Sequence, residues 1–126
     1  TSRHIYLNSK HPEGKIQWFM GDSRGRWDGD SLVVDVIHFT DQNWLDRSGN
    51  YHSGDMHLVE RWTRTSTDHL WYEATIEDPS VFARPFKMRF PLYRRIEPNI
   101  QLLEYECHTY LELEKERRAG VTAGDR

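Results

Sequence analysis

Short apolar runs separated by turn residues dominate the chain from residue 16 to residue 110. Several runs alternate apolar and polar positions with a period of two, which is typical of β-strands with one buried face. The pattern predicts strands over residues 16–20, 25–27, 31–39, 56–65, 69–76, 87–94 and 101–110, with a candidate edge strand at Ile5-Tyr6-Leu7. Seven short strands with turn signals between them favour an all-β barrel or sandwich.

Turn residues indicate that consecutive strands form hairpins. Asp28-Gly29 stands between two strand candidates, and an Asp-Gly pair supplies the positive φ values of a type I′ turn. Ser66-Thr67-Asp68 predicts a second tight hairpin, while Asp78-Pro79 and Glu97-Pro98-Asn99 predict strand ends, because proline cannot donate to a ladder. The connectivity is therefore expected to be an antiparallel meander.

The predicted fold is one domain, residues 1–126, forming a single antiparallel meander barrel of the lipocalin-like, calycin type. Residues 40–55 have neither strand nor helix period and are expected to be a long loop over one end of the barrel, with Trp44 and Leu45 to bury. Residues 111–126 are expected to be a charged tail that begins as a short helix and then frays.

Composition limits the partners. The chain has 126 residues, 17 Lys and Arg against 20 Asp and Glu, and a net charge of -3, which disfavours nucleic acid as a partner. No apolar run approaches the roughly 20 residues of a membrane-spanning helix, so we expect a soluble protein. A periplasmic or secreted location after loss of a leader stays open, as does homo-oligomerisation. Aromatic residues make up 13% of the chain and suit a cavity for a small apolar or aromatic molecule.

Candidate catalytic residues cluster in the segment His57-Leu58-Val59-Glu60-Arg61-Trp62. Alternation places Glu60 on the face of Leu58 and Trp62, where burial raises a carboxyl pKa and creates a proton acceptor near neutral pH. His57 and Arg61 fall on the opposite face and are the candidates that polarise a substrate. The alternative is structural: Glu60 pairs with an arginine of a neighbouring strand, and His57 and Arg61 lie on the surface.

Candidate ligand contacts are polar and aromatic residues at expected interior or loop positions: Asp35, Trp44, His52, Trp62, Tyr72 and Tyr105. The face of Asp35 also carries Val33 and Ile37, so a cavity carboxylate and a capping role are both open. Three of the four residues His38, His52, His57 and His108 could meet at one end of a barrel, but no His-x-His or His-Glu-x-x-His spacing supports a metal site. Neither a metal nor an organic cofactor is expected.

Three segments carry a resemblance to a known family. They are residues 20–35 (MGDSRGRWDGDSLVVD), 57–61 (HLVER) and 77–79 (EDP). The chain resembles, over most of residues 3–110, a family of small, uncharacterised and often exported bacterial proteins. His52-Ser53, His57, Glu60, Arg61 and Pro85 match recurring positions of that family, whereas Phe86 stands where it usually has tryptophan and Cys107-His108-Thr109 departs from its pattern. The resemblance implies no known reaction.

Two functions are compatible with these observations. The first is an enzyme that performs metal-independent acid-base chemistry, such as isomerisation, cyclisation or elimination by a lyase, on an apolar or aromatic substrate, with Glu60 as the base. The second is a non-catalytic binding or carrier protein whose interior polar residues orient a small hydrophobic ligand. The sequence does not name the ligand.

Overall fold

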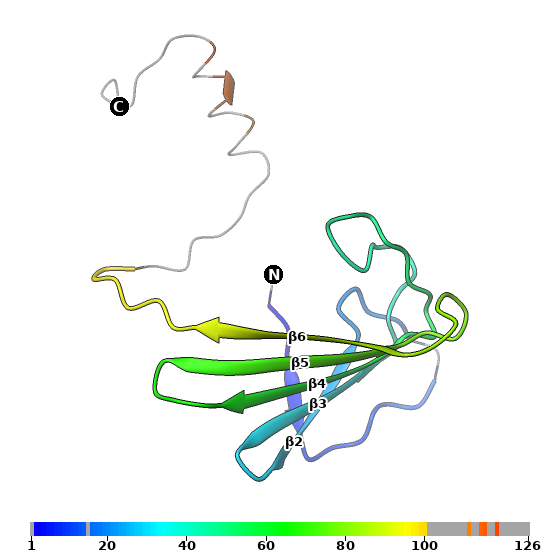
Figure 1. Ribbon diagram of the computed structural model, residues 1–126. Helices are drawn as coiled ribbons and strands as arrows, with labels where there is room; N and C mark the ends of the chain where they lie inside the picture. Colours follow the sequence, from blue (N-terminus) through cyan, green and yellow to red (C-terminus); the bar gives the residue numbers. More distant parts are fainter. Residues whose placement is uncertain (1, 15, 101–110, 112–113, 116–117, 119–126) are drawn as a thin grey trace. The chain divides into compact units, whose positions relative to one another are not determined.

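The computed structural model describes residues 2–14, 16–100, 111, 114–115 and 118. Its strands form one six-stranded sheet in which the spatial order follows the chain order (Figure 1). The strands are β1 (Ile5–Leu7), β2 (Asp22–Asp28), β3 (Ser31–Ile37), β4 (His57–Arg64), β5 (His69–Glu77) and β6 (Phe86–Tyr93). β1 pairs in parallel with β2, and all later pairs are antiparallel. The all-β prediction is confirmed, and the parallel β1 makes the sheet mixed instead of a pure meander.

The sheet is not closed into a barrel within the described residues, because β1 and β6 form its two edges. The strand predicted at residues 16–20 is wrong. Trp18 makes only an isolated bridge with Phe39, and its backbone groups bond to His38, Thr40 and Gly21. These hydrogen bonds form a turn, and because only one residue pair is bridged, residues 16–20 do not form a strand of the sheet. The strand predicted at residues 101–110 lies outside the described residues.

The hairpin between β2 and β3 is present, but its turn differs from the predicted type I′. Asp28 pairs with Ser31, so the two central residues are Gly29 and Asp30. Only Gly29 has a positive φ, of 56°. A positive φ at the first central residue alone is the pattern of a type II′ turn, in which glycine stands first. The hairpin between β4 and β5 and the strand end before Asp78-Pro79 are confirmed.

The sheet has two chemically distinct faces. The core face carries Val34, Val36 and Ile76, which are buried with Phe39 and Met56. Leu45 from the loop at residues 40–55 and Phe82 from the β5–β6 connection pack against this cluster. The polar face carries the alternate residues of each strand, among them Arg24, Arg26, Asp35, His57, Arg61, Glu73 and Arg89.

The chain has two compact units, residues Thr1–Arg94 and Arg95–Arg126. The first unit holds the whole sheet. In the second, the Arg95 side chain bonds to Glu97, and residues 111, 114–115 and 118 are helical, with Arg118 donating to Glu114 at 3.1 Å.

Gly21 allows the turn before β2 to press against β3. Its φ is +68°, and a Cβ there would lie 2.7 Å from Val36 Cγ1 and 2.9 Å from the Ile37 carbonyl oxygen. We expect Gly21→Ala to lower the free energy of unfolding by about 2 to 3 kcal/mol, from backbone strain plus overpacking. Gly29→Ala is the control, because Gly29 also has a positive φ but faces open space. Urea unfolding should show the smaller loss for Gly29→Ala, and equal losses would contradict the steric argument.

Candidate functional site

The chain after β1 turns back over the polar face of the sheet. Asn8 has a φ of 52° and its N–H donates to the Gly25 carbonyl at 2.9 Å, which ends the parallel strand. Arg24 then donates from Nη1 to Ser9 Oγ at 2.9 Å. These bonds hold residues 9–11 above β2 and β3, and they place the His11 ring between two carboxylates of the sheet.

Four side chains form a continuous hydrogen-bonded chain, here called the Asp-His chain. His11 Nδ1 lies 2.6 Å from Asp22 Oδ2, and His11 Nε2 lies 2.8 Å from Asp35 Oδ1. The other oxygen of Asp35 lies 3.0 Å from His57 Nε2. The order is therefore Asp22, His11, Asp35, His57, and each neighbouring pair comes from a different segment or strand.

Sheet register explains why Asp35 meets His57. Asp35 on β3 pairs with Val59 on β4, and His57 is two residues along β4 on the same face. Such diagonal neighbours lie within reach of long side chains. The Asp35 and His57 side chains are 44% and 38% exposed, so the pair is accessible to a small molecule.

Arg24 holds Asp22, the first residue of the Asp-His chain, in place. Its Nε and Nη2 donate to the two oxygens of Asp22 at 2.7 and 2.8 Å, and its guanidinium stacks 4.6 Å from the centre of the Tyr6 ring. Burial alone raises the pKa of Asp22, but the hydrogen bonds from Arg24 and His11 outweigh it and lower that pKa below its usual range. Asp22 is therefore ionised, and Arg24 holds it in position at one end of the Asp-His chain.

Asp35 is held ionised in the same way. Burial raises the pKa of Asp35, and the hydrogen bonds from His57 and then His11 more than offset this, so the pKa is lowered. The two ring nitrogens of His11 therefore face two ionised carboxylates, those of Asp22 and Asp35. His57 donates from Nε2, and its Nδ1 has no hydrogen-bond partner among the described residues.

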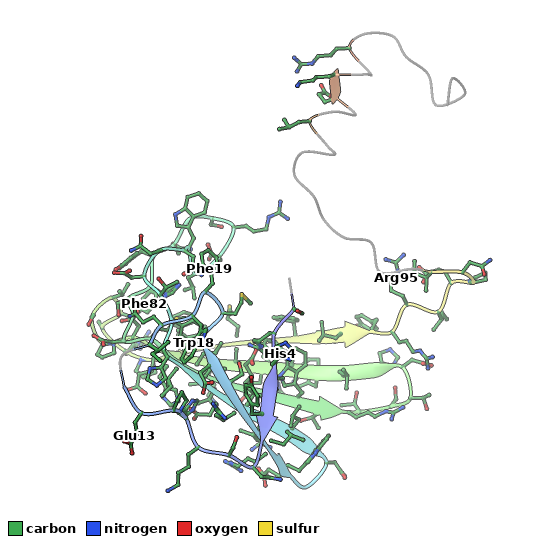
Figure 2. The ribbon with its side chains drawn as sticks, turned by 180° about the vertical axis from the view of Figure 1, so that it is seen from behind. His4, Glu13, Trp18, Phe19, Phe82 and Arg95 are labelled. Atoms are coloured by element: carbon green, nitrogen blue, oxygen red, sulfur yellow. The ribbon has the colours of Figure 1, made fainter. Side chains whose placement is uncertain are left out.

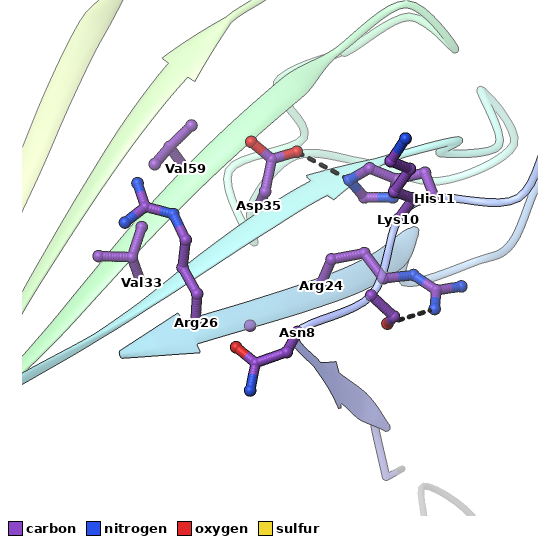
Figure 3. Close-up of a pocket in the computed structure, with 10 residues that line it drawn as sticks. Asn8, Lys10, His11, Arg24, Arg26, Val33, Asp35 and Val59 are labelled. Atoms are coloured by element: carbon purple, nitrogen blue, oxygen red, sulfur yellow. Dashed lines mark hydrogen bonds and ion pairs between the residues drawn. The ribbon is translucent and has the colours of Figure 1, made fainter. Parts of the chain in front are cut away.

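A cavity of about 670 Å³ lies beside the Asp-His chain (Figure 3). Its wall includes His11 and Asp35, the apolar side chains of Val33 and Val59, and the cations Lys10, Arg24 and Arg26. The volume lies within the range of small-molecule pockets. Arg24 is committed to Asp22, whereas Lys10 and Arg26 make no ion pair within the described part of the chain. The cavity can therefore take a small molecule that has an apolar body and an anionic group.

Glu60, the predicted catalytic base, lies on the core face. It is 4% exposed, and both of its oxygens are occupied, by Arg3 Nη2 at 2.6 Å and by the Tyr72 hydroxyl at 2.8 Å. Burial and then the negative charge of Glu60 raise the pKa of Tyr72, which stays a neutral donor. The Trp62 ring packs 4.4 Å from the Tyr72 ring. The structure thus brings Glu60, Trp62 and Tyr72 together on one face, and His57 and Asp35 on the other.

Three of the remaining predicted residues, Arg61, Trp44 and His52, make no side-chain hydrogen bond or ion pair with either group within the described part of the chain. Arg61 pairs with Asp28 at 2.6 Å on the surface. The expectation that Trp44 is buried together with Leu45 is wrong, because Trp44 is 71% exposed in the loop at residues 40–55 and only Leu45 packs against the core. His52 is buried, with Nε2 3.2 Å from Asn43 Oδ1 and Nδ1 3.0 Å from the Ser53 carbonyl oxygen. Tyr105 lies outside the described residues.

Three members of the site, His11, Asp22 and Arg24, were missed by the sequence analysis. The hairpin offered a signal for Arg24, since the turn fixes a register in which it pairs with Asp35. No signal pointed to His11, which lies in a segment without any period.

No family model, curated protein or solved structure matches this chain. Within the described residues, no helix is long and apolar enough to cross a membrane. The same part of the chain contains no group of three or more His, Cys, Asp or Glu side chains arranged to hold a metal ion.

Proposed function

We propose that the protein is a small-molecule enzyme that performs metal-independent acid-base chemistry at the cavity beside the Asp-His chain. One observation carries the proposal: Asp35 lines the cavity of about 670 Å³, and its second oxygen accepts from Nε2 of His57, a neighbour of the cavity wall, at 3.0 Å. A carboxylate that accepts from one ring nitrogen fixes the tautomer of a histidine and stabilises its protonated form. His57 Nδ1 is then the proton acceptor.

The rest of the site has supporting roles in this proposal. His11 holds Asp35 in place from the other side, and Arg24 fixes Asp22 at the end of the chain. Lys10 and Arg26 bind the anionic group of the substrate, while Val33 and Val59 contact its apolar part. Proton transfer at a carbon next to a carbonyl would serve isomerisation, cyclisation or elimination.

His57 suits the role of base better than Glu60 does. Both oxygens of Glu60 already accept hydrogen bonds, from Arg3 and Tyr72, so a substrate must displace one of them. His57 is partly exposed, and its Nδ1 has no partner within the described residues. Glu60 is then a structural residue of the core face.

The alternative function is that of a non-catalytic binding protein for the same kind of anionic molecule. It is favoured by the fact that both nitrogens of His11 and both oxygens of Asp35 are already occupied, which suits a rigid binding site.

A closed lipocalin-like barrel also remains a proposal. It requires a further strand between β6 and β1, for which residues 101–110 are the candidate in the sequence.

Deuterium exchange tests for a catalytic base without knowledge of the substrate. The protein is incubated in D₂O with a panel of aliphatic and aromatic 2-oxo and 3-oxo carboxylates, and incorporation at carbon is followed by NMR. We expect the parent to accelerate exchange of at least one compound, and His57→Gln to reduce that rate about 10²- to 10⁴-fold. His69→Gln is the control, because His69 lies at the β4–β5 hairpin and bonds to Ser66.

The outcomes separate the two functions. Arg26→Gln should weaken binding of the exchanging compound and leave the rate at saturation close to that of the parent, as expected for uniform binding. Binding without exchange would favour the carrier. No binding of any carboxylate would contradict the proposed ligand class, and exchange that survives His57→Gln would exclude His57 as the base.

A further inference from the structure

The cations Lys10 and Arg26 occupy separate parts of the wall of the cavity beside the Asp-His chain. Lys10 lies on the segment that runs from β1 to Glu13 (Figure 2). Arg26 lies on β2, two residues beyond the one that pairs with Asp35, and two residues span about 7 Å along a strand. Figure 3 shows the two cations apart, with Asp35 between them in that view. The cavity therefore has a cation at each of two ends.

Neither cation is neutralised by an ion pair within the described part of the chain. The other Lys and Arg side chains of the polar face have carboxylate partners there: Arg24, Arg61, Lys87 and Arg89. A surface that pairs its other cations but leaves two beside a cavity attracts an anionic ligand to that cavity. The unpaired charge of the wall is that of two cations.

Asp35 keeps an anionic group out of the middle of the cavity. It is ionised, and its two oxygens already accept from His11 and His57. Its negative charge repels a carboxylate placed beside it. Val33 and Val59 line the same cavity, and Val59 is the partner of Asp35 on β4. The middle of the cavity therefore suits an uncharged part of a ligand, and its two ends suit negative charges.

We infer that the ligand of this cavity is a dianion with two separate carboxylate groups, one bound by Lys10 and the other by Arg26. Its uncharged middle lies against Val33 and Val59, beside Asp35. The inference rests on the proposed function and names its substrate class: the carbon that loses a proton to His57 lies between the two carboxylates.

Two oxo acids with the same chain length test the inference. 2-Oxopentanedioate has a carboxylate at each end, and 2-oxopentanoate has a methyl group at one end. Binding is measured at constant ionic strength by titrating the ¹⁵N-labelled full chain and following the amide shifts of residues 8–11 and 24–26. We expect the dicarboxylate to bind the parent about 10-fold more tightly, which is the effect of roughly one charge-assisted hydrogen bond.

The preference for the dicarboxylate should require both cations. Lys10→Gln and Arg26→Gln should each weaken the dicarboxylate about 10-fold, whereas the monocarboxylate should change little, because it binds at the cation that remains. Both variants should fold, since neither side chain has an ion pair to lose. Lys87→Gln is the matched control: it removes one charge from the polar face, but Lys87 pairs with Glu73 at 3.0 Å and lies outside this wall. It should leave the preference unchanged.

Deuterium exchange of the same two acids separates this inference from the proposed function. A preference for the dicarboxylate without exchange would support the dianion and favour the carrier over the enzyme. Exchange of both acids, bound with equal affinity, would overturn the dianion and leave the acid-base function in place.

Three binding results would overturn the inference. The first is equal affinity of the parent for the two acids, or no binding of either at about 1 mM. The second is a preference for the dicarboxylate that survives in both Lys10→Gln and Arg26→Gln. The third is an equal loss for the two acids in each variant, because both cations would then hold one and the same carboxylate.

Discussion

Replacing Glu60 by glutamine is expected to lower the free energy of unfolding by about 3 kcal/mol, the lower end of the cost of breaking a buried ion pair. Glutamine keeps the shape, and Tyr72 can turn its hydroxyl to accept from the new amide. The charge opposite Arg3 is lost, however, and the Arg3 side chain is only 21% exposed. Urea unfolding at neutral pH measures the loss.

A double-mutant cycle with Arg3→Gln assigns this loss to the ion pair. The double variant should be more stable than the sum of the single losses implies, with a coupling energy of about 1 to 3 kcal/mol. Asp28→Asn is the matched control, because Asp28 also pairs with an arginine at 2.6 Å but on the surface; we expect little change there. A Glu60→Gln variant as stable as the parent would show that Glu60 is not held by Arg3 and would return it to the list of candidate bases.

The strands were predictable from the sequence where one face is buried. Alternation in residues 57–64 and 69–77 identified β4 and β5, and it placed Glu60 on the apolar face, where the structure has it. A period of two is enough for this because a shift of one residue would turn every apolar side chain to water. The ends of strands were less predictable. The apolar pattern continues to Phe39, but β3 ends at Ile37 because His38 adopts a φ of 62°, and the apolar pattern contains no signal for that backbone conformation.

The candidate site depends on which strands pair and in which register, and neither can be read from the local sequence pattern. Asp35 and His57 were both recognised as candidates, but their contact depends on the register of β3 and β4. His11 reaches the site through a turn at Asn8 and a parallel strand of three residues. Such long-range contacts have no local pattern. The barrel prediction depended in part on residues 101–110, which lie outside the described residues.

Asp22→Asn is expected to lower the free energy of unfolding by about 2 to 3 kcal/mol at pH 7, because it removes the partner of both Arg24 and His11. The Asp22 side chain is only 6% exposed, and Arg24 donates to both of its oxygens. The amide of asparagine has one accepting oxygen, so one donor is left facing an NH₂ group. Asp30→Asn, an exposed aspartate in the β2–β3 turn, is the control and should leave stability nearly unchanged.

The pH dependence identifies the charge as the cause. The pKa of Asp22 is lower in the folded protein than in the unfolded chain, where it is about 3.9. A carboxyl group of this kind contributes stability above its unfolded pKa, and the contribution is lost as the pH falls through the folded pKa. The stability difference between the parent and Asp22→Asn should therefore be full at pH 6 to 7 and shrink steadily below about pH 4. Urea unfolding of both proteins across that range measures it. A difference that stays constant down to about pH 2 would mean that Asp22 acts through its hydrogen-bonding shape instead of its charge, and the ionised Asp-His chain would have to be abandoned.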